Sequence, residues 1–195
     1  AKPPGLAGVL RVIQQHQVAV GCQHGLHRDR PVRIHDIDHL GEQFGDAVVN
    51  GFTALAALDS NGDNRIDAVV FCNTSGALPL PDTEGFVEWI RSGGAFIGMH
   101  SATDTLKDAL PYTEMICGIF EGHREQVPVK LHAGDQEHPA NGGIGAIWTL
   151  AQEEMYLIKK HDRNLVRSIW FMRHHPNDPK QEGFFPVAWV RKYGE

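Results

Sequence analysis

Two short apolar runs on either side of an amphipathic segment form the clearest pattern in this chain. Residues 67–73 (DAVVFCN) are apolar and rich in Val, and they lead into Thr-Ser-Gly, which predicts a buried strand followed by a loop. Apolar residues then recur at helical spacing between Asp82, a residue suited to an N-cap, and the pair Gly93 and Gly94, which ends helices. Residues 95–99 (AFIGM) predict a second buried strand. Because the connections are short, we expect a right-handed βαβ crossover in a largely parallel sheet.

The same patterns predict elements on both sides of this unit. Residues 17–22 (QVAVGC) predict the first strand, and residues 34–44 carry apolar side chains at a spacing that predicts the first helix. Residues 52–58 fit a strand or a helix, because the run is too short for periodicity to distinguish them. Beyond residue 123, loops rich in Gly, Pro and Asn alternate with further predicted strands, at Val127–Leu131, Tyr156–Lys160 and Val166–Met172.

The size and composition indicate one ordinary globular domain. At 195 residues, with 42% hydrophobic and 22% charged residues, the chain is long enough for one sizeable core and too short for two. A formal net charge of -6 without a long Lys/Arg run argues against a nucleic-acid or acidic-membrane surface, because such surfaces need clustered cations. No apolar run has the length to cross a bilayer, and the first residues lack the core of a signal peptide. We therefore expect a cytoplasmic protein, or an exported one if a leader was removed.

The cysteines indicate no special site, whereas the histidines do. Cys22, Cys72 and Cys117 are far apart and odd in number, which predicts buried thiols and not a disulfide framework or a zinc ribbon. The 12 histidines are the unusual feature of the composition. Because His is the commonest metal ligand and the usual acid–base group near neutral pH, this enrichment indicates that a site should be sought.

Polar side chains gather just after the predicted strands. Ligands of open parallel α/β sheets bind beyond the carboxyl ends of the strands, so these residues are candidates for a site. They are Gln23, His24, His27, Arg28 and Asp29 after the first strand, Asn73, Thr74 and Ser75 after the second, and His100, Ser101, Thr103 and Asp104 after the third.

His100 is the strongest of these candidates, because small residues flank it. Residues 98–102 (GMHSA) have small side chains at both second neighbours of the histidine, as in a nucleophile elbow, where the central side chain projects from a strained strand-to-helix turn. The adjoining helix N-terminus favours the neutral imidazole, which suits a general base or a metal ligand. Ser101, Thr103 and Asp104 fit helix-capping roles as well as site roles. We predict residues 98–104 as the functional centre.

Other motifs have structural explanations beside their functional ones. His123, His132 and His138 add imidazoles without the HExxH spacing of a zinc site, so a metal site and a solvated surface both stay open. Residues 59–67 resemble the first part of an EF-hand loop, yet the required Gly and bidentate Glu are missing, so we predict an Asx-type turn. The four tryptophans are expected in the core, and residues 174–176 (HHP) in a surface loop.

Six segments together resemble the ThuA-like, or trehalose-utilisation, family. They are residues 67–76 (DAVVFCNTSG), 89–105 (WIRSGGAFIGMHSATDT), Gly118–His123 (GIFEGH), Glu137–Pro139 (EHP), Glu153–Tyr156 (EEMY) and Pro186–Gly194 (PVAWVRKYG). The resemblance implies the flavodoxin-like fold of class I glutamine amidotransferases, a mostly parallel sheet with helices on both faces. It implies a single ThuA-like domain over residues 1–195. Residues 1–66 match the family poorly, and the family continues past the last segment, so we expect the domain to be truncated at its C-terminus.

The same resemblance implies roles for individual residues. The amidotransferases carry a Cys nucleophile where this chain has His100, so covalent acyl transfer is not expected. His123 and Glu154 would assist His100 in catalysis, and His100 and His123 would hold a divalent metal such as zinc if the protein uses one. The expected substrate-binding residues are Asn73, Thr74, Ser101, Asp104, His138, Tyr156 and His27, the last in a His27-Arg28-Asp29 cluster like one that follows the first strand in the family.

Three functions remain open on these grounds. The first is an enzyme that performs hydrolysis or elimination on a sugar derivative, such as trehalose or a related glycoside, with His100 as base or metal ligand. The second is a non-catalytic carbohydrate-binding or regulatory domain, because fold does not determine function. The third is a divalent-metal-dependent hydrolase of a non-sugar substrate. The expected partner is a small molecule, a sugar or glycoside in the first two cases, and a homo-oligomer is compatible with all three.

Overall fold

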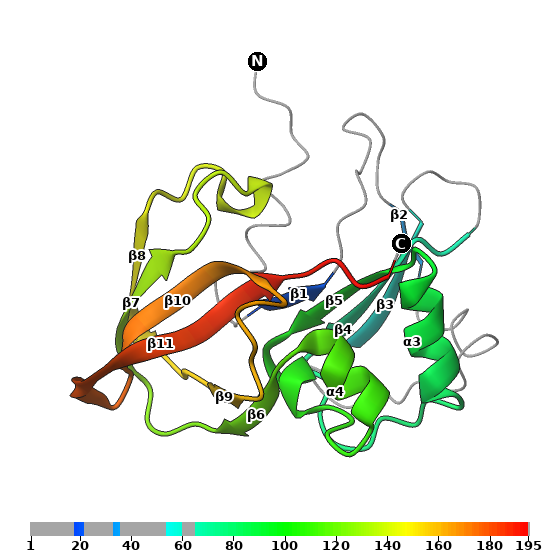
Figure 1. The fold of residues 1–195 in the computed structure, drawn as a ribbon, viewed down its shortest axis with the longest axis horizontal. Helices are drawn as coiled ribbons and strands as arrows, with labels where there is room; N and C mark the ends of the chain where they lie inside the picture. Colours follow the sequence, from blue (N-terminus) through cyan, green and yellow to red (C-terminus); the bar gives the residue numbers. More distant parts are fainter. Residues whose placement is uncertain (1–17, 22–32, 36–53, 60–64, 195) are drawn as a thin grey trace.

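Three sheets make up most of the fold (Figure 1) in the computed structural model, which describes residues 18–21, 33–35, 54–59 and 65–194. The first sheet has the strand order β1-β5-β4-β3-β2, formed by Val18–Gly21, Ala95–Met99, Ala68–Cys72, Ala54–Asp59 and Arg33–His35. The second has the order β11-β10-β7-β8, formed by Asp178–Val190, Arg167–His175, Val127–Ala133 and Ile147–Glu153. The third pairs β6 (Ile119–Gly122) with β9 (Leu157–Lys159).

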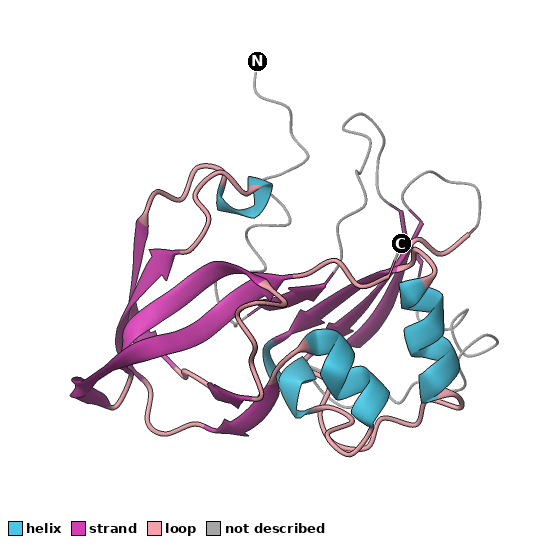
Figure 2. Cartoon of the chain, in the orientation of Figure 1, coloured by secondary structure: helices cyan, strands magenta, loops and turns pink. Residues whose placement is uncertain are grey.

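Two α-helices and two short 3-10 helices accompany these strands in the described residues. They are α3 (Thr83–Arg91), α4 (Leu110–Ile116), η3 (His100–Asp104) and η4 (Pro139–Asn141). Figure 2 shows both α-helices beside the first sheet, whereas the short helix η4 and loops lie beside β7 and β8 of the second sheet. Among the described residues, no helix has the length and apolar character needed to cross a membrane.

The expected mostly parallel, flavodoxin-like α/β sheet with helices on both faces is wrong for this chain. Within the described residues, β4 and β5 form the one parallel pair of neighbouring strands, and the other pairings in the three sheets are antiparallel. The length of the connections explains part of this result. Parallel neighbours need a crossover of about a dozen or more residues, whereas residues 60–67 join β3 to β4 and only residues 176–177 join β10 to β11. These connections therefore return the chain antiparallel to the strand before.

The predicted βαβ unit itself is confirmed. Strand β5 has the predicted bounds, and it pairs in parallel with β4 in a register that sets Ala68 beside Ala95. Helix α3 begins after Asp82, whose side chain accepts a hydrogen bond of 2.8 Å from the Gly85 N–H, as the N-cap prediction requires. The helix buries Phe86, Val87 and Ile90 against the sheet, the apolar face that the spacing predicted.

The other element predictions have mixed outcomes. Strands β1 and β9 lie within the ranges predicted for them, and β7 and β10 overlap their predicted ranges and extend beyond them. The run predicted as either a strand or a helix contains a strand, because residues 54–59 form β3. The helix predicted over residues 34–44 is wrong at its start, because Ile34 and His35 belong to β2 and pair with β3, while residues 36–44 lie outside the described part. The loop predicted at His174 is also wrong, since β10 continues through His175 and pairs with β11.

Two clusters of buried apolar side chains hold the described part of the chain together. The first lies between the first sheet and the two α-helices, and consists of Val69, Phe71, Phe86, Val87, Ile90, Phe96, Ala102, Tyr112, Met115 and Ile116. The second lies on the second sheet and consists of Val129, Leu131, Met155, Ile169, Trp170, Met172, Val187, Ala188 and Val190. As predicted, the tryptophans belong to the interior: Trp89 and Trp148 pack against these clusters, and Trp170 and Trp189 are buried. Cys72 and Cys117 are free thiols, half-buried and buried, while Cys22 and the Asx-type turn predicted around residues 60–64 lie outside the described residues.

Side chains from the C-terminal half of the chain cap the end of α4. These hydrogen bonds join the part of the chain that holds the second cluster to a helix of the first cluster. The last carbonyls of a helix lack partners within the helix and need other donors. The Trp189 Nε1–H donates to the Ile116 carbonyl at 2.7 Å, and Arg191 Nη1 donates to the Glu114 carbonyl at 2.6 Å. The His161 ring nitrogen Nδ1 lies 3.1 Å from the Cys117 carbonyl. Since a carbonyl oxygen only accepts, Nδ1 of His161 is the protonated nitrogen.

Acidification is expected to destabilise the protein through His161. Burial lowers the pKa of His161, outweighing the opposite effect of its hydrogen bond to Cys117. The unfolded chain therefore takes up this proton first, so the stability from neutral His161 is complete above about pH 6.5 and is lost as the pH falls toward the lower folded-state pKa. Thermal unfolding followed by circular dichroism at pH 7.5 and 5.5 should show a smaller decrease in Tm for His161→Gln, whose amide keeps a donor for Cys117. Equal decreases in both proteins would contradict this.

Candidate active site

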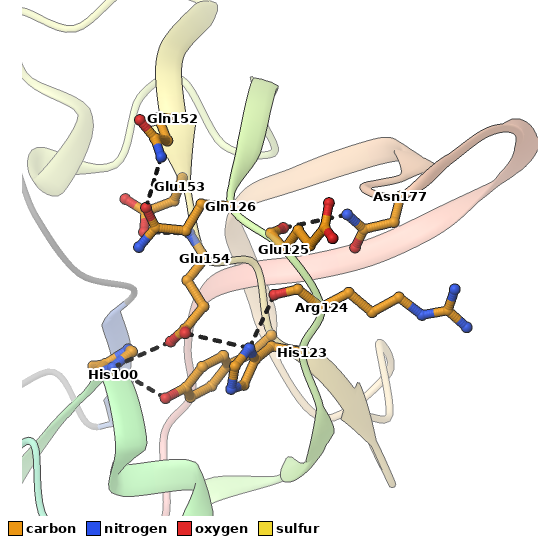
Figure 3. Close-up of polar contacts among 10 residues, drawn as sticks. His100, His123, Arg124, Glu125, Gln126, Gln152, Glu153, Glu154 and Asn177 are labelled. Atoms are coloured by element: carbon orange, nitrogen blue, oxygen red, sulfur yellow. Dashed lines mark hydrogen bonds and ion pairs between the residues drawn. The ribbon is translucent and has the colours of Figure 1, made fainter.

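Four side chains from three regions of the chain converge at the carboxyl end of β5. His100 Nε2 lies 3.0 Å from the Tyr156 hydroxyl and 3.8 Å from Glu154 Oε2. His123 Nδ1 lies 3.2 Å from Glu154 Oε1. Figure 3 shows the Glu154 carboxylate between the rings of His100 and His123. These four residues, His100, His123, Glu154 and Tyr156, are called the His-Glu-Tyr cluster from here on.

The β6–β9 pairing explains why sequence-distant members of the cluster meet. These strands are antiparallel, with Phe120 opposite Ile158 and Gly122 opposite Leu157. His123 follows β6 and Tyr156 precedes β9, so continuing the ladder by one residue sets them opposite each other. Their rings stack with centroids 5.8 Å apart and an interplanar angle of 22°. The pairing of two short strands thus brings segments that are thirty-odd residues apart in sequence to one place.

His100 occupies the strained turn that its small neighbours predicted. It is the first residue after β5 and the first of η3, and its φ of 50° lies in the left-handed region that residues other than glycine rarely adopt. The hydroxyl of Thr103 donates to the His100 carbonyl at 3.3 Å, which helps to hold this turn. The His100 side chain is 16% exposed, so the ring is largely but not completely shielded from solvent. The strand-to-helix geometry predicted for residues 98–104 is therefore confirmed.

Glu154 connects the two imidazoles. It follows β8 directly, and its backbone N–H donates to the Glu153 side chain at 2.8 Å. His123 Nδ1 faces this carboxylate and also the Arg124 carbonyl at 3.1 Å. Because both of these oxygens only accept, Nδ1 of His123 carries the proton, and its Nε2 has the lone pair available to a ligand. At 27% exposure, Glu154 can orient both rings while staying within reach of a bound molecule.

The Tyr156 hydroxyl is a proton donor at neutral pH. Burial raises the pKa of Tyr156, and the negative charges of Glu154 and Asp104 and a hydrogen bond to Glu154 raise it further. Tyr156 therefore stays protonated, and its hydroxyl can donate to Glu154 while it accepts from His100, or donate to His100 instead. This freedom lets the hydroxyl accommodate either protonation state of His100 Nε2.

Two residues absent from the sequence prediction border the cluster. The Phe120 ring lies against Tyr156, with centroids 4.3 Å apart, and its centroid is 6.0 Å from that of His123. The Lys107 ammonium pairs with Asp104 at 2.6 Å and lies 5.7 Å from the Phe120 centroid. Phe120 belongs to the GIFEGH segment that resembles the ThuA-like family, which was the available signal for it. No pattern in the sequence marks Lys107.

The remaining predicted substrate-binding residues have other surroundings. Thr74 is 1% exposed, and its hydroxyl is hydrogen-bonded to that of Thr105 at 2.7 Å, which is a structural role. Asn73 and Ser101 lie half-buried next to the ends of β4 and β5, near the cluster in the fold. His138 is buried and caps η4, where its Nδ1 accepts from the Ala140 N–H at 3.2 Å. His27 and its cluster with Arg28 and Asp29 lie outside the described residues.

The described residues do not fit a metal centre. His132, the other histidine considered for such a site, lies on β7 with its ring 5.8 Å from that of Phe171. Within the part of the chain that the structure describes, no three His, Cys, Asp or Glu side chains are arranged so that they could hold a metal ion. His100 and His123 are instead joined through Glu154 and Tyr156, which suits proton transfer between side chains.

Comparisons with known proteins agree with the family resemblance. The family model of ThuA, described as trehalose utilisation, matches residues 17–195. No curated protein matches the chain. Among solved structures, a protein from Bacteroides uniformis described as ThuA-like is 18% identical, with a TM-score of 0.49, and the match covers 66% of this chain and 60% of that one. The matched part of the present chain thus spans less than two thirds of that protein. From the family match over most of its length, this chain belongs to the ThuA (trehalose utilisation) family.

Proposed function

We propose that this protein is an acid–base enzyme of carbohydrate metabolism that acts on a sugar or glycoside, with His100 as the general base. Membership of the ThuA family supports the role in carbohydrate metabolism. The observation that carries the enzymatic part is the His-Glu-Tyr cluster, in which one carboxylate contacts two imidazoles and a hydroxyl contacts one of them. His100 also has a left-handed backbone conformation at a strand end, and such conformations cluster at functional sites.

In this proposal each side chain of the cluster has a part that its contacts support. His100 Nε2, which faces Tyr156 and Glu154, removes a proton from the substrate or from a water molecule. Glu154, 3.8 Å away, stabilises the positive charge that then develops on the ring. Tyr156 accepts from the protonated Nε2 by turning its own proton toward Glu154. His123, held by Glu154 through Nδ1, presents Nε2 and hands a proton to the leaving oxygen when that nitrogen is protonated.

Covalent acyl transfer does not belong to this proposal. The strained turn at the end of β5 holds the imidazole of His100 and no thiol. Of the free thiols of the described residues, Cys117 lies at the end of α4 and contacts Asp162, and Cys72 lies on β4 opposite Met99. Proton abstraction with hydrolysis or elimination is the chemistry that two imidazoles, one carboxylate and one hydroxyl support.

A substrate panel tests this proposal. The panel contains oxidised and unoxidised disaccharides and glycosides, incubated with the protein with and without an added divalent ion, and product formation is followed by chromatography. We expect turnover of at least one sugar without an added ion. No product from any sugar, with or without the ion, would contradict the proposal and favour a carbohydrate-binding or regulatory domain, and product formation only with the added ion would favour a metal-dependent hydrolase.

A further inference from the structure

Beside the His-Glu-Tyr cluster, the described residues combine an aromatic face with a pair of opposite charges. Phe120 is half-buried and lies against the buried Tyr156 ring, which stacks in turn on His123, so Phe120 is the more accessible of the two rings for a bound molecule. The Asp104–Lys107 ion pair lies at the end of η3 and just beyond it, and the Lys107 ammonium approaches the Phe120 ring. The side chains of Asp104 and Lys107 are 26% and 43% exposed, so both can reach a molecule bound at the cluster.

This combination has the chemistry of a sugar-binding surface. A sugar ring has apolar C–H faces that pack on aromatic rings, and hydroxyl groups around its edge that both donate and accept hydrogen bonds. A carboxylate accepts from such hydroxyls and an ammonium donates to them. Phe120 offers a ring for the C–H face, Asp104 accepts from hydroxyl groups, and Lys107 donates to them. The three side chains lie close together, because Lys107 contacts both of the others.

The charges around the cluster favour a neutral ligand over an anionic one. Within the part of the chain that the structure describes, Asp104 and Glu154 are two carboxylates against the single ammonium of Lys107 at this place, and Lys107 is already paired with Asp104. Strand β6 and the loop after it together add more negative than positive charge, because Glu121 on β6 and Glu125 in the loop accompany Arg124. An added phosphate or carboxylate on the sugar therefore meets net repulsion.

We propose that Phe120, Asp104 and Lys107 form the specificity wall of the active site, which stacks a sugar ring and selects neutral sugars over phosphorylated ones. Phe120 is a binding residue here, and the ion pair sets the charge preference. This inference rests on the proposed function for the identity of the ligand. Its test is equilibrium binding, which is measured separately from turnover.

The first test uses trehalose and trehalose 6-phosphate as a matched pair of probes that differ by one phosphate. Titrations are followed by ligand-detected NMR with the full chain carrying His100→Ala, so that turnover does not consume the probe. Trehalose is expected to bind at least about tenfold more tightly than its phosphate, which is a free-energy difference of about 1.4 kcal/mol. Equal or tighter binding of the phosphorylated sugar, or no detectable binding of either probe, overturns the proposal whether or not the wild-type chain turns over a sugar.

Variants of the wall then separate stacking from charge. Phe120→Leu, which keeps an apolar side chain, should weaken trehalose binding about tenfold through the lost aromatic face. Asp104→Asn removes one carboxylate, so the ratio of the affinity for trehalose to the affinity for trehalose 6-phosphate should fall about tenfold. The matched control is Phe184→Leu, because Phe184 is also half-buried and carries the Arg163 cation at 4.0 Å, outside this site. If Phe184→Leu weakens trehalose binding as much as Phe120→Leu, the assignment of Phe120 is wrong.

Discussion

Replacing His100 with Ala is expected to lower kcat by about 10²–10⁴-fold on any sugar that the wild-type protein turns over, because this range is typical for the loss of a positioned general base. The reason is geometric: Nε2 of His100 is the imidazole atom that faces both the Tyr156 hydroxyl and the Glu154 carboxylate. Glu154→Gln should lower kcat less, since it removes the charge that stabilises the protonated ring and keeps the base. Initial rates at saturating substrate give kcat for each variant.

The control for His100→Ala is His174→Ala, which removes an exposed imidazole on β10. Nδ1 of His174 lies 3.1 Å from the Pro179 carbonyl, away from the His-Glu-Tyr cluster. This variant should retain wild-type kcat. Circular dichroism melts of both variants confirm that each is folded before rates are compared. Retention of wild-type kcat by His100→Ala would remove His100 as the base and leave the acid–base proposal without its central residue.

Trp189→Ala is expected to have the largest effect on stability, a loss of about 3–5 kcal/mol of unfolding free energy, as for other buried aromatic truncations. The indole is 2% exposed and packs on Gly118, where an added Cβ would come within 2.7 Å of the ring. Its N–H caps the Ile116 carbonyl at the end of α4, and the His161 ring lies at 4.8 Å in a T-shaped contact. The substitution therefore opens a cavity and leaves a helix carbonyl without its donor. Urea unfolding at pH 7.5 measures the change.

Trp189→Phe separates the two contributions. It retains most of the buried aromatic volume and removes the N–H, so the loss should be smaller, about 1–3 kcal/mol for a buried acceptor left unsatisfied plus a small cavity. The control is Trp89→Phe, a change of the same kind. The Trp89 indole is half-buried and packs against the first cluster of apolar side chains. A Trp189→Phe variant as stable as Trp89→Phe would show that the cap on Ile116 contributes little.

Local pattern was a reliable guide where the interactions were themselves local. The Asp82 cap, the apolar face of α3 and the bounds of β5 each depend on residues within a few positions of one another. The His100 turn is of the same kind, since small neighbours and a strand end suffice to predict it. The family resemblance added His123, Glu154 and Tyr156, and these are the residues that meet His100 in space.

The direction in which strands pair was beyond such patterns. An apolar run of five or six residues has the same composition whether its neighbour runs parallel or antiparallel, so β3 and β4 looked like parts of a parallel sheet. The decision came from the length of the connections and from contacts between distant segments, such as β10 with β7 and β11 with the end of α4. Parallel pairing was therefore correct for β4 and β5, which a helix connects, and wrong elsewhere in the described residues.

By itself, the sequence determined the βαβ unit, the strained position of His100 and the kinds of residue available for acid–base chemistry. Only the tertiary structure decided that Glu154 lies between two imidazoles, that His138 caps a 3-10 helix and Thr74 pairs with Thr105, and that Lys107 and Phe120 border the site. The physical reason is range. Caps, turns and helix faces are set by neighbours in sequence, whereas the site depends on the β6–β9 register and on where η3 comes to lie against β6.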